Sequence, residues 1–371
     1  MSDSAPMVVL AGGGTGGHVV PALALADTFK AAGSPVVFVG TAHGYETRMV
    51  PKRGYTLHTV QGSRLVGGGV LAKLRGLRAL WRGVREARAL FRQLQPKLVV
   101  GVGGYASGAA LLAARSMGIA CAIHESNAVP GLTNKVLGLV VHRVYLGFSA
   151  ARKAFSSSKS LVSGNPVRAE IAAVAANRTF RGNRPAHVLV VGGSQGSEFL
   201  NQHVPKMLSK VQQAGMALEV RHQVGKLAPA PVQAAYAECG LQASVEGFID
   251  DMASAYAWAD FAVTRSGSGT VAELAAAALP ALLVPFPYAA GDHQAANAQA
   301  YCKPGSGAWV RQTAWRSDEV AHMATTLFGT ERAWNQCVAA ARAMALADAA
   351  GTVVRDCGNW VGVPAWREVK A

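Results

Sequence analysis

Short apolar runs recur along the chain and alternate with longer segments in which apolar and polar residues mix. Short runs rich in Val, Ile and Leu are typical of strands buried in a parallel sheet, and the mixed segments between them are typical of helices. The runs that predict strands are 7–10, 36–39, 56–60, 98–102, 119–123, 187–191, 218–222, 244–247, 260–264 and 281–284. This alternation predicts an α/β protein with a parallel sheet in each half of the chain.

The two halves are separated at residues 163–168, where Asn165 and Pro166 interrupt regular structure. The strand–helix pattern then starts again, which predicts two Rossmann-like domains. A chain of 371 residues is long enough for both. Residues from about 317 to 360 predict a helical tail.

Positive charge is concentrated in the first half. Of the 36 Lys and Arg and 21 Asp and Glu residues, 19 basic and 5 acidic residues precede position 165, a net charge of +14. The remainder has 17 against 16, a net charge of +1. This asymmetry predicts one basic surface that faces an anionic partner, either a nucleic acid or a membrane.

Much of this charge lies in one predicted helix after the glycine-rich, aliphatic segment 62–71. Its basic residues are Lys73, Arg75, Arg78, Arg82, Arg85, Arg88 and Arg92, against one acid, Glu86. A basic helix beside an apolar loop favours a membrane-surface element, and a solvated outer face of the domain is the alternative. Nucleic acid is less favoured, because no recognised binding motif accompanies the charge.

The cysteines and the hydropathy indicate in which cellular compartment the protein resides. The five cysteines are scattered, odd in number and without metal-site spacing, which predicts reduced thiols. No apolar run approaches the roughly 18 residues of a membrane-spanning helix, and the N-terminus does not resemble a secretory signal. We therefore expect a cytoplasmic protein.

The first strand leads into a glycine-rich turn, GGGTGGH at residues 12–18. Its spacing matches the dinucleotide fingerprint formally, but the second strand ends at Gly40-Thr41-Ala42 without an acid for a ribose. The turn is either a tight strand–helix connection or a backbone that a ligand approaches closely. The charged form of a histidine at a helix N-terminus is disfavoured, so His18 is predicted to be a neutral imidazole able to accept a proton.

Two more polar clusters follow strands of the first half, at 103–108 and at 124–127. Ligands of open α/β sheets bind at the carboxyl ends of the strands. We therefore expect these clusters to converge with the first glycine turn.

The second half has two turns of the same kind, at 192–197 and at 265–273, each between a strand and a helix. Free amides and the helix dipole at such a junction favour a phosphate or diphosphate. Thr270 and Glu273 fit a capping box, which is a structural explanation for the acid. The functional alternative is that Glu273 accepts hydrogen bonds from sugar hydroxyls.

The motifs together resemble one family. GGGTGGHVVPALALA, GGYASG, HESNAVPGLTNK, GNPVR, GGSQGS, FIDDM, RSGSGTVAEL and DHQAANA occur in the order found in the MurG family, over roughly residues 7–300. These are inverting N-acetylglucosaminyltransferases that convert lipid I to lipid II in peptidoglycan synthesis. The resemblance implies the GT-B fold, an α/β architecture with two Rossmann-like domains facing across a cleft. It also implies that the C-terminal helix returns to the first domain, giving an acceptor domain of 1–164 plus about 345–371 and a UDP-GlcNAc domain of 165–344.

The resemblance also implies site residues. Ile249 is expected to meet the uracil through its backbone, Glu273 the ribose hydroxyls, and His293 and Gln294 the GlcNAc hydroxyls. The other residues expected to bind UDP-GlcNAc are Thr15, Gly16, Gly17, Asn127, Arg168, Ser194, Ser268, Gly269 and Thr270. Thr15, His18 and Tyr105 are expected to bind the acceptor.

The expected mechanism is a single in-line attack by the acceptor hydroxyl, with His18 as the base and Glu125 or a water as alternatives. The chain has no Asp-x-Asp pair to hold a metal on the diphosphate, so the reaction is expected to require no cofactor. Stimulation of the reaction by a divalent cation is compatible with this expectation. The expected partners are UDP-GlcNAc, lipid I, the anionic cytoplasmic face of the inner membrane, and other cell-wall synthesis and division proteins, without nucleic acid.

Other functions remain open at this point. One is a GT-B transferase with a diacylglycerol or soluble acceptor, and another is a UDP-sugar 2-epimerase. A nucleotide-sugar-binding protein without turnover is a third, and the NAD-dependent dehydrogenase is the least favoured because of the missing ribose acid.

Overall fold

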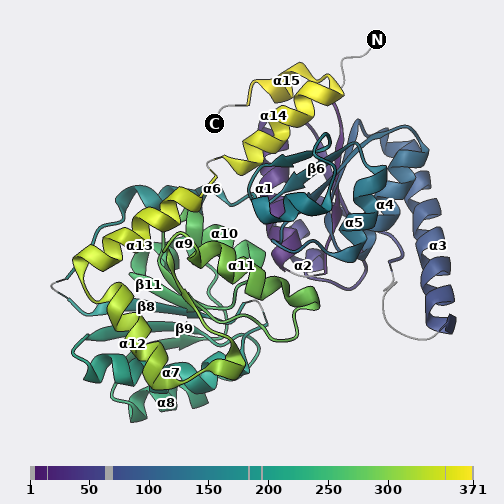
Figure 1. Cartoon of the computed structure of the whole chain (residues 1–371). Coiled ribbons are helices and arrows are strands. Elements are labelled where there is room, and N and C mark those ends of the chain that lie inside the picture. The colour runs from purple at the N-terminus through teal and green to yellow at the C-terminus, as the bar shows by residue number, and fades with distance from the viewer. Residues whose placement is uncertain are drawn as a thin grey trace. The chain divides into compact units, whose positions relative to one another are not determined.

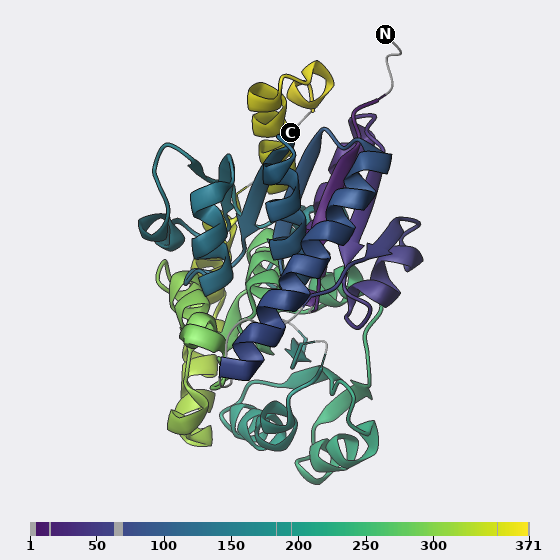
Figure 2. The ribbon, with the colours of Figure 1, turned by 90° about the vertical axis from the view of Figure 1, so that its right-hand side faces the viewer.

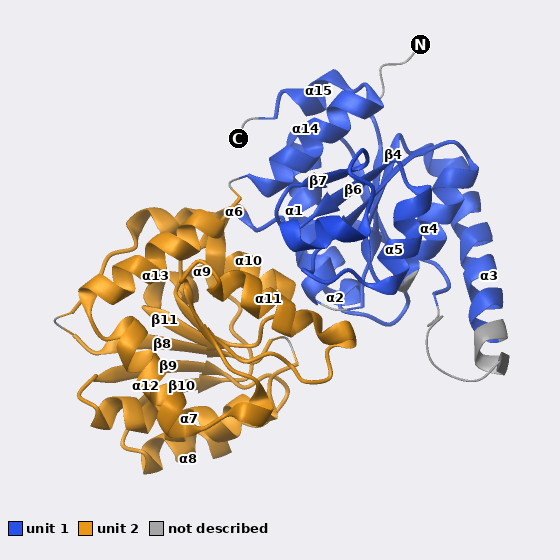
Figure 3. Cartoon of the chain, in the orientation of Figure 1, with its two compact units in different colours: residues 1–168, 347–371 blue, residues 169–346 orange. Residues whose placement is uncertain are grey.

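The computed structural model describes residues 5–14, 16–62, 70–182, 184–193, 195–346 and 348–369, with only the backbone given for residues 70–74 and 105. The chain forms two compact units (Figure 3): unit 1 comprises residues 1–168 and 347–371, and unit 2 comprises residues 169–346. The boundaries expected from the sequence were 164/165 and about 344/345. The C-terminal segment thus belongs to the same unit as the first half of the chain.

Unit 1 contains a seven-stranded sheet in the order β3-β2-β1-β4-β5-β6-β7, and every pair of neighbouring strands is parallel. Its strands are β1 (Val8–Gly12), β2 (Val36–Gly40), β3 (Thr56–Thr59), β4 (Leu98–Gly103), β5 (Ala120–Glu125), β6 (Arg143–Leu146) and β7 (Ser160–Val162). Its helices are α1 (Gly16–Ala31), α2 (Glu46–Lys52), α3 (Val70–Leu94), α4 (Tyr105–Ser116), α5 (Leu132–Val140), α14 (Ala349–Val361) and α15 (Pro364–Arg367), with the 3-10 helix η1 (Ser149–Ala154).

The two faces of this sheet are covered by different helices (Figures 1 and 2). On one face α1, α14 and α15 bury an apolar core that includes Phe29 and Trp366. On the other face α3, α4 and α5 bury a second core that includes Phe91 and Leu137. The return of the C-terminal segment to this unit is stabilised by Arg143, which donates two hydrogen bonds to Asp356 of α14 at 3.1 and 3.2 Å.

Unit 2 contains a six-stranded parallel sheet in the order β10-β9-β8-β11-β12-β13. Its strands are β8 (Ala186–Val191), β9 (Leu218–Gln223), β10 (Gln242–Glu246), β11 (Phe261–Thr264), β12 (Ala281–Leu283) and β13 (Gly307–Trp309). Its helices are α6 (Ala169–Ala172), α7 (Glu198–Gln213), α8 (Pro229–Glu238), α9 (Met252–Trp258), α10 (Ser268–Ala276), α11 (His293–Cys302), α12 (Ser317–Phe328) and α13 (Glu331–Met344). Short 3-10 helices are η2 (Ala173–Asn177), η3 (Ala290–Asp292) and η4 (Gln312–Ala314).

Both sheets have the strand order of a Rossmann fold, so the predicted α/β class with two parallel sheets is confirmed. Strands β6, β7 and β13 were not predicted. Each has only three or four residues, and none stands out as an apolar run.

Taken together, α13 and α14 have the length and the apolar composition of one membrane-spanning helix. They are two helices, however, and they belong to different units. Trp334 and Val338 of α13 are buried in unit 2, and Val353 and Val354 of α14 are buried in unit 1. Burial of this kind is typical of the core helices of a globular protein.

Candidate active site

In unit 2 the two glycine turns lie side by side. Strands β8 and β11 are neighbours, with Val191 opposite Thr264, and the amide of Arg265 donates to the carbonyl of Val191 at 3.3 Å. The turns that follow these strands therefore meet at the carboxyl edge of the sheet. This is the point where the strand order reverses, and ligands of open parallel sheets bind at such points.

Helix α10 begins at Ser268, directly after this turn, and its N-cap is Gly267, which offers no side-chain acceptor. The first amides of a helix have no acceptor within the helix. The amides of Ser268, Gly269 and Thr270 therefore face outward at the positive end of the dipole, an arrangement that favours an anion.

The predicted capping box is wrong. Thr270 is the third residue of α10 and not its N-cap, because the helix starts earlier than the pattern indicated. The carboxylate of Glu273 instead accepts a hydrogen bond from the Tyr256 hydroxyl at 2.9 Å. Tyr256 comes from α9 and is buried, so it fixes the orientation of this carboxylate.

Ile249 lies buried just before α9, and its amide already has a partner. The N–H of Ile249 donates to Gln223 Oε1 at 3.0 Å, and Gln223 Nε2 donates to the carbonyl of Gly193 at 3.1 Å. Gln223, the last residue of β9, thus ties the first glycine turn of unit 2 to the Ile249 segment. A ligand that meets the Ile249 backbone would use its carbonyl oxygen.

Helix α11 places its first residues beside the second glycine turn. Gln294 Oε1 accepts from the amide of Phe286 at 2.9 Å, so the donor that this side chain can offer a ligand is its NH₂ group. The hydroxyl of Ser266 donates to the Gln294 carbonyl at 2.8 Å, and Asn297 donates to the Ser266 carbonyl at 3.1 Å. His293 donates through Nδ1 to the carbonyl of Ala290 at 2.8 Å.

Arg265 is a buried cation beneath these turns. Its guanidinium donates to the carbonyls of Val284 and Pro285, both at 3.1 Å, and to Gln312 Oε1 at 3.0 Å. It also lies between the rings of Phe199 and Phe286, at 5.8 and 5.7 Å from their centroids. Burial lowers the pKa of Arg265 to about 10, so it remains charged at neutral pH. Its hydrogen-bond partners in the described chain are uncharged oxygens, so its charge adds to the positive potential at the turns.

In unit 1 the glycine turns pack backbone against backbone. The amide of Gly13 donates to the Gly103 carbonyl at 3.2 Å, and a Cβ atom built on Gly104 would lie 2.5 Å from the Gly13 carbonyl oxygen. The ring of His18 lies over Gly103, where a Cβ atom would be 2.7 Å from its Cδ2. His18 donates through Nδ1 to the Gly13 carbonyl at 3.2 Å. The expected convergence at the carboxyl ends of β1 and β4 is therefore confirmed.

The α1 turn differs from the α10 turn because a carboxylate of the same chain occupies it. Glu46, the first residue of α2, is buried, and its Oε2 accepts from the amide of Gly14 at 2.6 Å. Its Oε1 accepts from the amide and the hydroxyl of Thr41 at 3.1 and 2.9 Å. We did not identify Glu46 from the sequence. The signal available was that it is one of only five acids in the basic first half.

The third polar cluster of unit 1 is organised by Glu125 at the end of β5. This buried carboxylate accepts from the amide and side chain of Asn127 at 2.9 and 3.2 Å, from the amide of Gly131 at 3.1 Å and from Asn134 at 2.8 Å. Glu125 therefore holds the loop that leads into α5. The neighbouring His124 is fully buried, which lowers its pKa.

Several predicted residues are placed only in part. Thr15 and Ser194 lie outside the described residues, and for Tyr105 only the backbone is given, as the first residue of α4. Gly16 and Gly17 begin α1, and half-buried Arg168 is the last residue of the first segment of unit 1. Across the described ranges, no group of three or more His, Cys, Asp or Glu residues is arranged to hold a metal ion.

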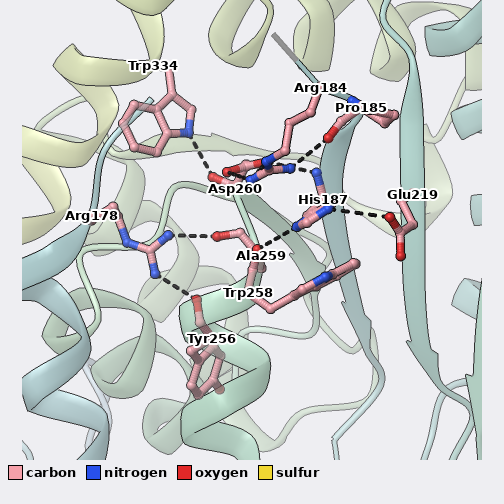
Figure 4. Close-up of polar contacts among 10 residues, drawn as sticks. All are labelled: Arg178, Arg184, Pro185, His187, Glu219, Tyr256, Trp258, Ala259, Asp260 and Trp334. Atoms are coloured by element: carbon pink, nitrogen blue, oxygen red, sulfur yellow. Dashed lines mark hydrogen bonds and ion pairs between the residues drawn. The ribbon is translucent and has the colours of Figure 1, made fainter. Parts of the chain in front are cut away.

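The opposite, amino edge of the unit 2 sheet has a different polar cluster (Figure 4). Asp260 accepts from Arg184 at 3.0 Å and from the amide of His187 at 2.8 Å, and Trp334 donates to the Asp260 carbonyl at 2.8 Å. A cavity of about 650 Å³ lies beside it, lined by apolar side chains that include Phe180 and by Arg184 and Asp260. These polar groups pair with one another, so the cluster closes the amino edge of the sheet. The candidate site is therefore assigned to the glycine turns at the carboxyl edge.

Comparisons with known proteins identify the class. The sequence profile of the glycosyltransferase family 28 N-terminal domain matches residues 8–146, and that of the family 28 C-terminal domain matches residues 187–352. The chain therefore belongs to glycosyltransferase family 28, and its two parallel sheets with flanking helices form the GT-B fold.

Its relatives narrow the assignment. A UDP-N-acetylglucosamine--N-acetylmuramyl-(pentapeptide) pyrophosphoryl-undecaprenol N-acetylglucosamine transferase from Acidithiobacillus ferrooxidans is 42% identical over 98% of this chain and 99% of its own length. The crystal structure of Acinetobacter baumannii MurG has a TM-score of 0.77 and 31% identity, covering 94% of this chain and 98% of that one. A Listeria monocytogenes protein assigned as a UDP-N-acetylglucosamine 2-epimerase has a TM-score of 0.68 but only 12% identity, which shows a shared fold alone. Within family 28, the chain is a member of the MurG group.

Proposed function

We propose that the protein transfers GlcNAc from UDP-GlcNAc to the 4-hydroxyl of the MurNAc sugar of lipid I, undecaprenyl-pyrophosphoryl-MurNAc-pentapeptide, with inversion at the anomeric carbon. The product is lipid II, a precursor of peptidoglycan. The relatives that match nearly the whole chain bear the name of this transferase. The structural observation that carries the proposal is the start of α10, because its N-cap residue, Gly267, supplies no side-chain acceptor to the first amides of the helix and leaves them to a nucleotide diphosphate.

The donor is assigned to unit 2. The amides of Ser268, Gly269 and Thr270 and the turn at 192–197 take the diphosphate, while the carbonyl of Ile249 accepts from the imide N–H of uracil. Glu273, oriented by Tyr256, accepts from the ribose hydroxyls. Gln294 and His293 at the start of α11 are assigned to the GlcNAc hydroxyls.

The leaving group is stabilised by this same region. As the bond between the anomeric carbon and UDP breaks, negative charge accumulates on the diphosphate. Fixed amides and the buried guanidinium of Arg265 are in place before the reaction, so they stabilise that charge without reorganisation. On this account no metal ion is required.

Unit 1 is assigned to the acceptor. His18 is the base that takes the proton from the MurNAc hydroxyl through Nε2, since Nδ1 is held by the Gly13 carbonyl. The four hydrogen bonds to Glu125 favour a role in positioning Asn127 and the following loop over a role as the base. The amides at the starts of α1 and α4, including those of Gly16, Gly17 and Tyr105, are available for the acceptor's diphosphate, with Thr15 and Arg168 as further contacts.

We assign the membrane-facing surface to α3 and α5, which lie on one face of the unit 1 sheet with α4 between them (Figures 1 and 2). The large apolar side chains Leu77 and Trp81 of α3 and Leu132, Val136 and Leu139 of α5 are all more than half exposed. Exposed basic residues accompany them: Arg75, Arg78, Arg82, Arg85 and Lys135. Apolar and basic side chains together favour the surface of an anionic bilayer, consistent with peripheral attachment at the cytoplasmic face of the inner membrane, where a lipid-linked acceptor resides.

The proposal is tested by incubating the protein with radiolabelled UDP-GlcNAc and a lipid I analogue. Labelled lipid II and free UDP are expected, with a β-linkage in the product. Formation of UDP-ManNAc from UDP-GlcNAc alone would instead establish a 2-epimerase, and binding of UDP-GlcNAc without turnover of any acceptor would reduce the protein to a binding protein.

A further inference from the structure

Glu46 is buried, and its hydrogen-bond donors within the described residues are uncharged. Only 1% of its surface is exposed, and its three hydrogen bonds come from the amides of Gly14 and Thr41 and from the Thr41 hydroxyl. Removing a carboxylate from water costs several kcal/mol unless hydrogen bonds compensate. This buried carboxylate lies at the turn that leads to His18.

Three glycines make room for this carboxylate. Cβ atoms built on Gly13 and Gly44 would each lie 2.1 Å from an atom of the Glu46 carboxyl group, and one built on Gly40 would lie 2.8 Å from its Cγ. No side chain fits at these positions without displacing Glu46. The glycine turn of unit 1 is therefore shaped around a carboxylate from its own chain.

The carboxylate and the imidazole contact opposite ends of one peptide group. The carbonyl of Gly13 and the N–H of Gly14 belong to the same peptide bond. Glu46 accepts from the N–H at 2.6 Å, and His18 Nδ1 donates to the carbonyl at 3.2 Å. Because a carbonyl oxygen only accepts, Nδ1 must carry the proton, and Nε2 is left with a lone pair.

We propose that Glu46 is a positioning residue for His18, acting through the peptide bond between Gly13 and Gly14. An anion at the N–H end polarises the peptide and makes its carbonyl a stronger acceptor. This stabilises the Nδ1–H tautomer and the imidazolium that forms when Nε2 takes a proton. A carboxylate plays the same part for the histidine of Ser-His-Asp enzymes by direct contact, whereas here a peptide group lies between the two side chains.

This inference rests on the proposed function for the role of His18 as the base. The tautomer and the titration of His18 can be measured independently of that role. Among the described side chains, His124 on β5 is a second titratable group that interacts with His18, and it is buried and adjoins Glu125. Burial lowers the pKa of His124, which favours its neutral form. Removal of the negative charge of Glu46 should therefore change the tautomer and the titration of His18.

The test combines ¹⁵N NMR of the histidine rings with activity. In the wild type, His18 should show a protonated Nδ1 and an unprotonated Nε2. Glu46→Gln keeps the shape but removes the charge, so it should lower the pKa of His18 by about one unit. With lipid I analogue and saturating UDP-GlcNAc, kcat should fall about tenfold, the acidic limb of its pH profile should move to lower pH, and the KM for the donor should stay the same.

The matched control is Glu86→Gln, because Glu86 also accepts from a backbone amide in unit 1, that of Gln61 at 2.7 Å. It should change neither the His18 titration nor kcat. An unchanged pKa of His18 in Glu46→Gln, or an Nε2–H tautomer in the wild type, overturns the inference. If Glu46→Gln fails to fold, Glu46→Asp is measured in its place. Glu46→Asp keeps the charge, so it should retain the wild-type pKa of His18. If instead His18→Ala keeps full activity while the NMR results hold, the proposed base is wrong and the influence of Glu46 on His18 stands.

Discussion

The starts of α1 and α10 are built alike and are used differently. Each follows a central strand of a parallel sheet through a glycine turn at the point where the strand order reverses. In the turn before α1 the amide of Gly14 is bonded to Glu46, whereas Gly267, the N-cap of α10, supplies no side-chain acceptor. The comparison teaches that a glycine-rich turn alone does not define a site for the donor's diphosphate. What decides at each amide is whether the chain has already supplied the anion, as Glu46 does at Gly14.

The charged and titratable side chains around the two turns also differ. At the α1 turn an imidazole and a carboxylate contact the two ends of one peptide group, which suits proton transfer from an acceptor. The α10 turn has the buried guanidinium of Arg265 beneath it, which suits a leaving group that gains negative charge. Variants in the two units should therefore affect different steps.

The largest effect is expected from His18→Ala. Loss of a general base should lower kcat by about 10²- to 10⁴-fold, while UDP affinity, which depends on unit 2, should remain unchanged. The transfer assay and calorimetric titration with UDP measure the two quantities. The matched control is His43→Ala, an exposed histidine of the same unit. A loss of kcat smaller than tenfold would place the base elsewhere.

The second effect concerns the outer surfaces of the two units. Arg78→Glu with Arg85→Glu on α3 should weaken binding to anionic vesicles by at least about 30-fold, since each basic residue near such a surface contributes about 1 kcal/mol. UDP affinity should be unaltered. The same charge change in unit 2, Arg181→Glu with Arg332→Glu at exposed positions, should leave vesicle binding as it was. Equal losses in both double variants would show that only net charge matters.

A smaller effect is expected from Glu273→Gln at the α10 turn. Loss of a charged acceptor for the ribose hydroxyls should weaken UDP binding about tenfold, and 2′-deoxy-UDP should then bind nearly as well as UDP. Calorimetric titration with both nucleotides tests this, with Glu238→Gln, an exposed acid of unit 2, as the control. If Glu273→Gln still prefers UDP to the deoxy form by the wild-type ratio, Glu273 does not read the ribose.

The smallest effect concerns pH and the support of the unit 2 turns. His222 on β9 is buried between Tyr236 and Asn201, and burial lowers its pKa to about 3. The unfolded chain binds a proton near pH 6.5, so the stabilisation is complete above that pH and declines as pH falls towards 3. The free energy of unfolding of unit 2 should drop by about 1 kcal/mol between pH 7.5 and 5.5. Urea unfolding at the two pH values measures it, and His222→Gln should remove this part of the pH dependence.

Sequence patterns predicted the two sheets, the glycine turns and the position of His18 at a helix start, because each depends on residues close together in the chain. They did not predict Gln223, Tyr256 or Glu46. The contact of Glu46 with Gly14 spans 32 residues, and that of Gln223 with Ile249 spans 26, so only the fold brings them together. The capping box was wrong for a local reason, since Gly267 ends the turn before Thr270 is reached.

The most direct test of the account is a crystal structure with UDP bound. The diphosphate oxygens should lie about 2.7–3.2 Å from the amides of Ser268, Gly269 and Thr270, with the ribose against Glu273 and with Glu46 still bonded to Gly14. A diphosphate bound to the amide of Gly14, with Glu46 displaced from it, would contradict the account.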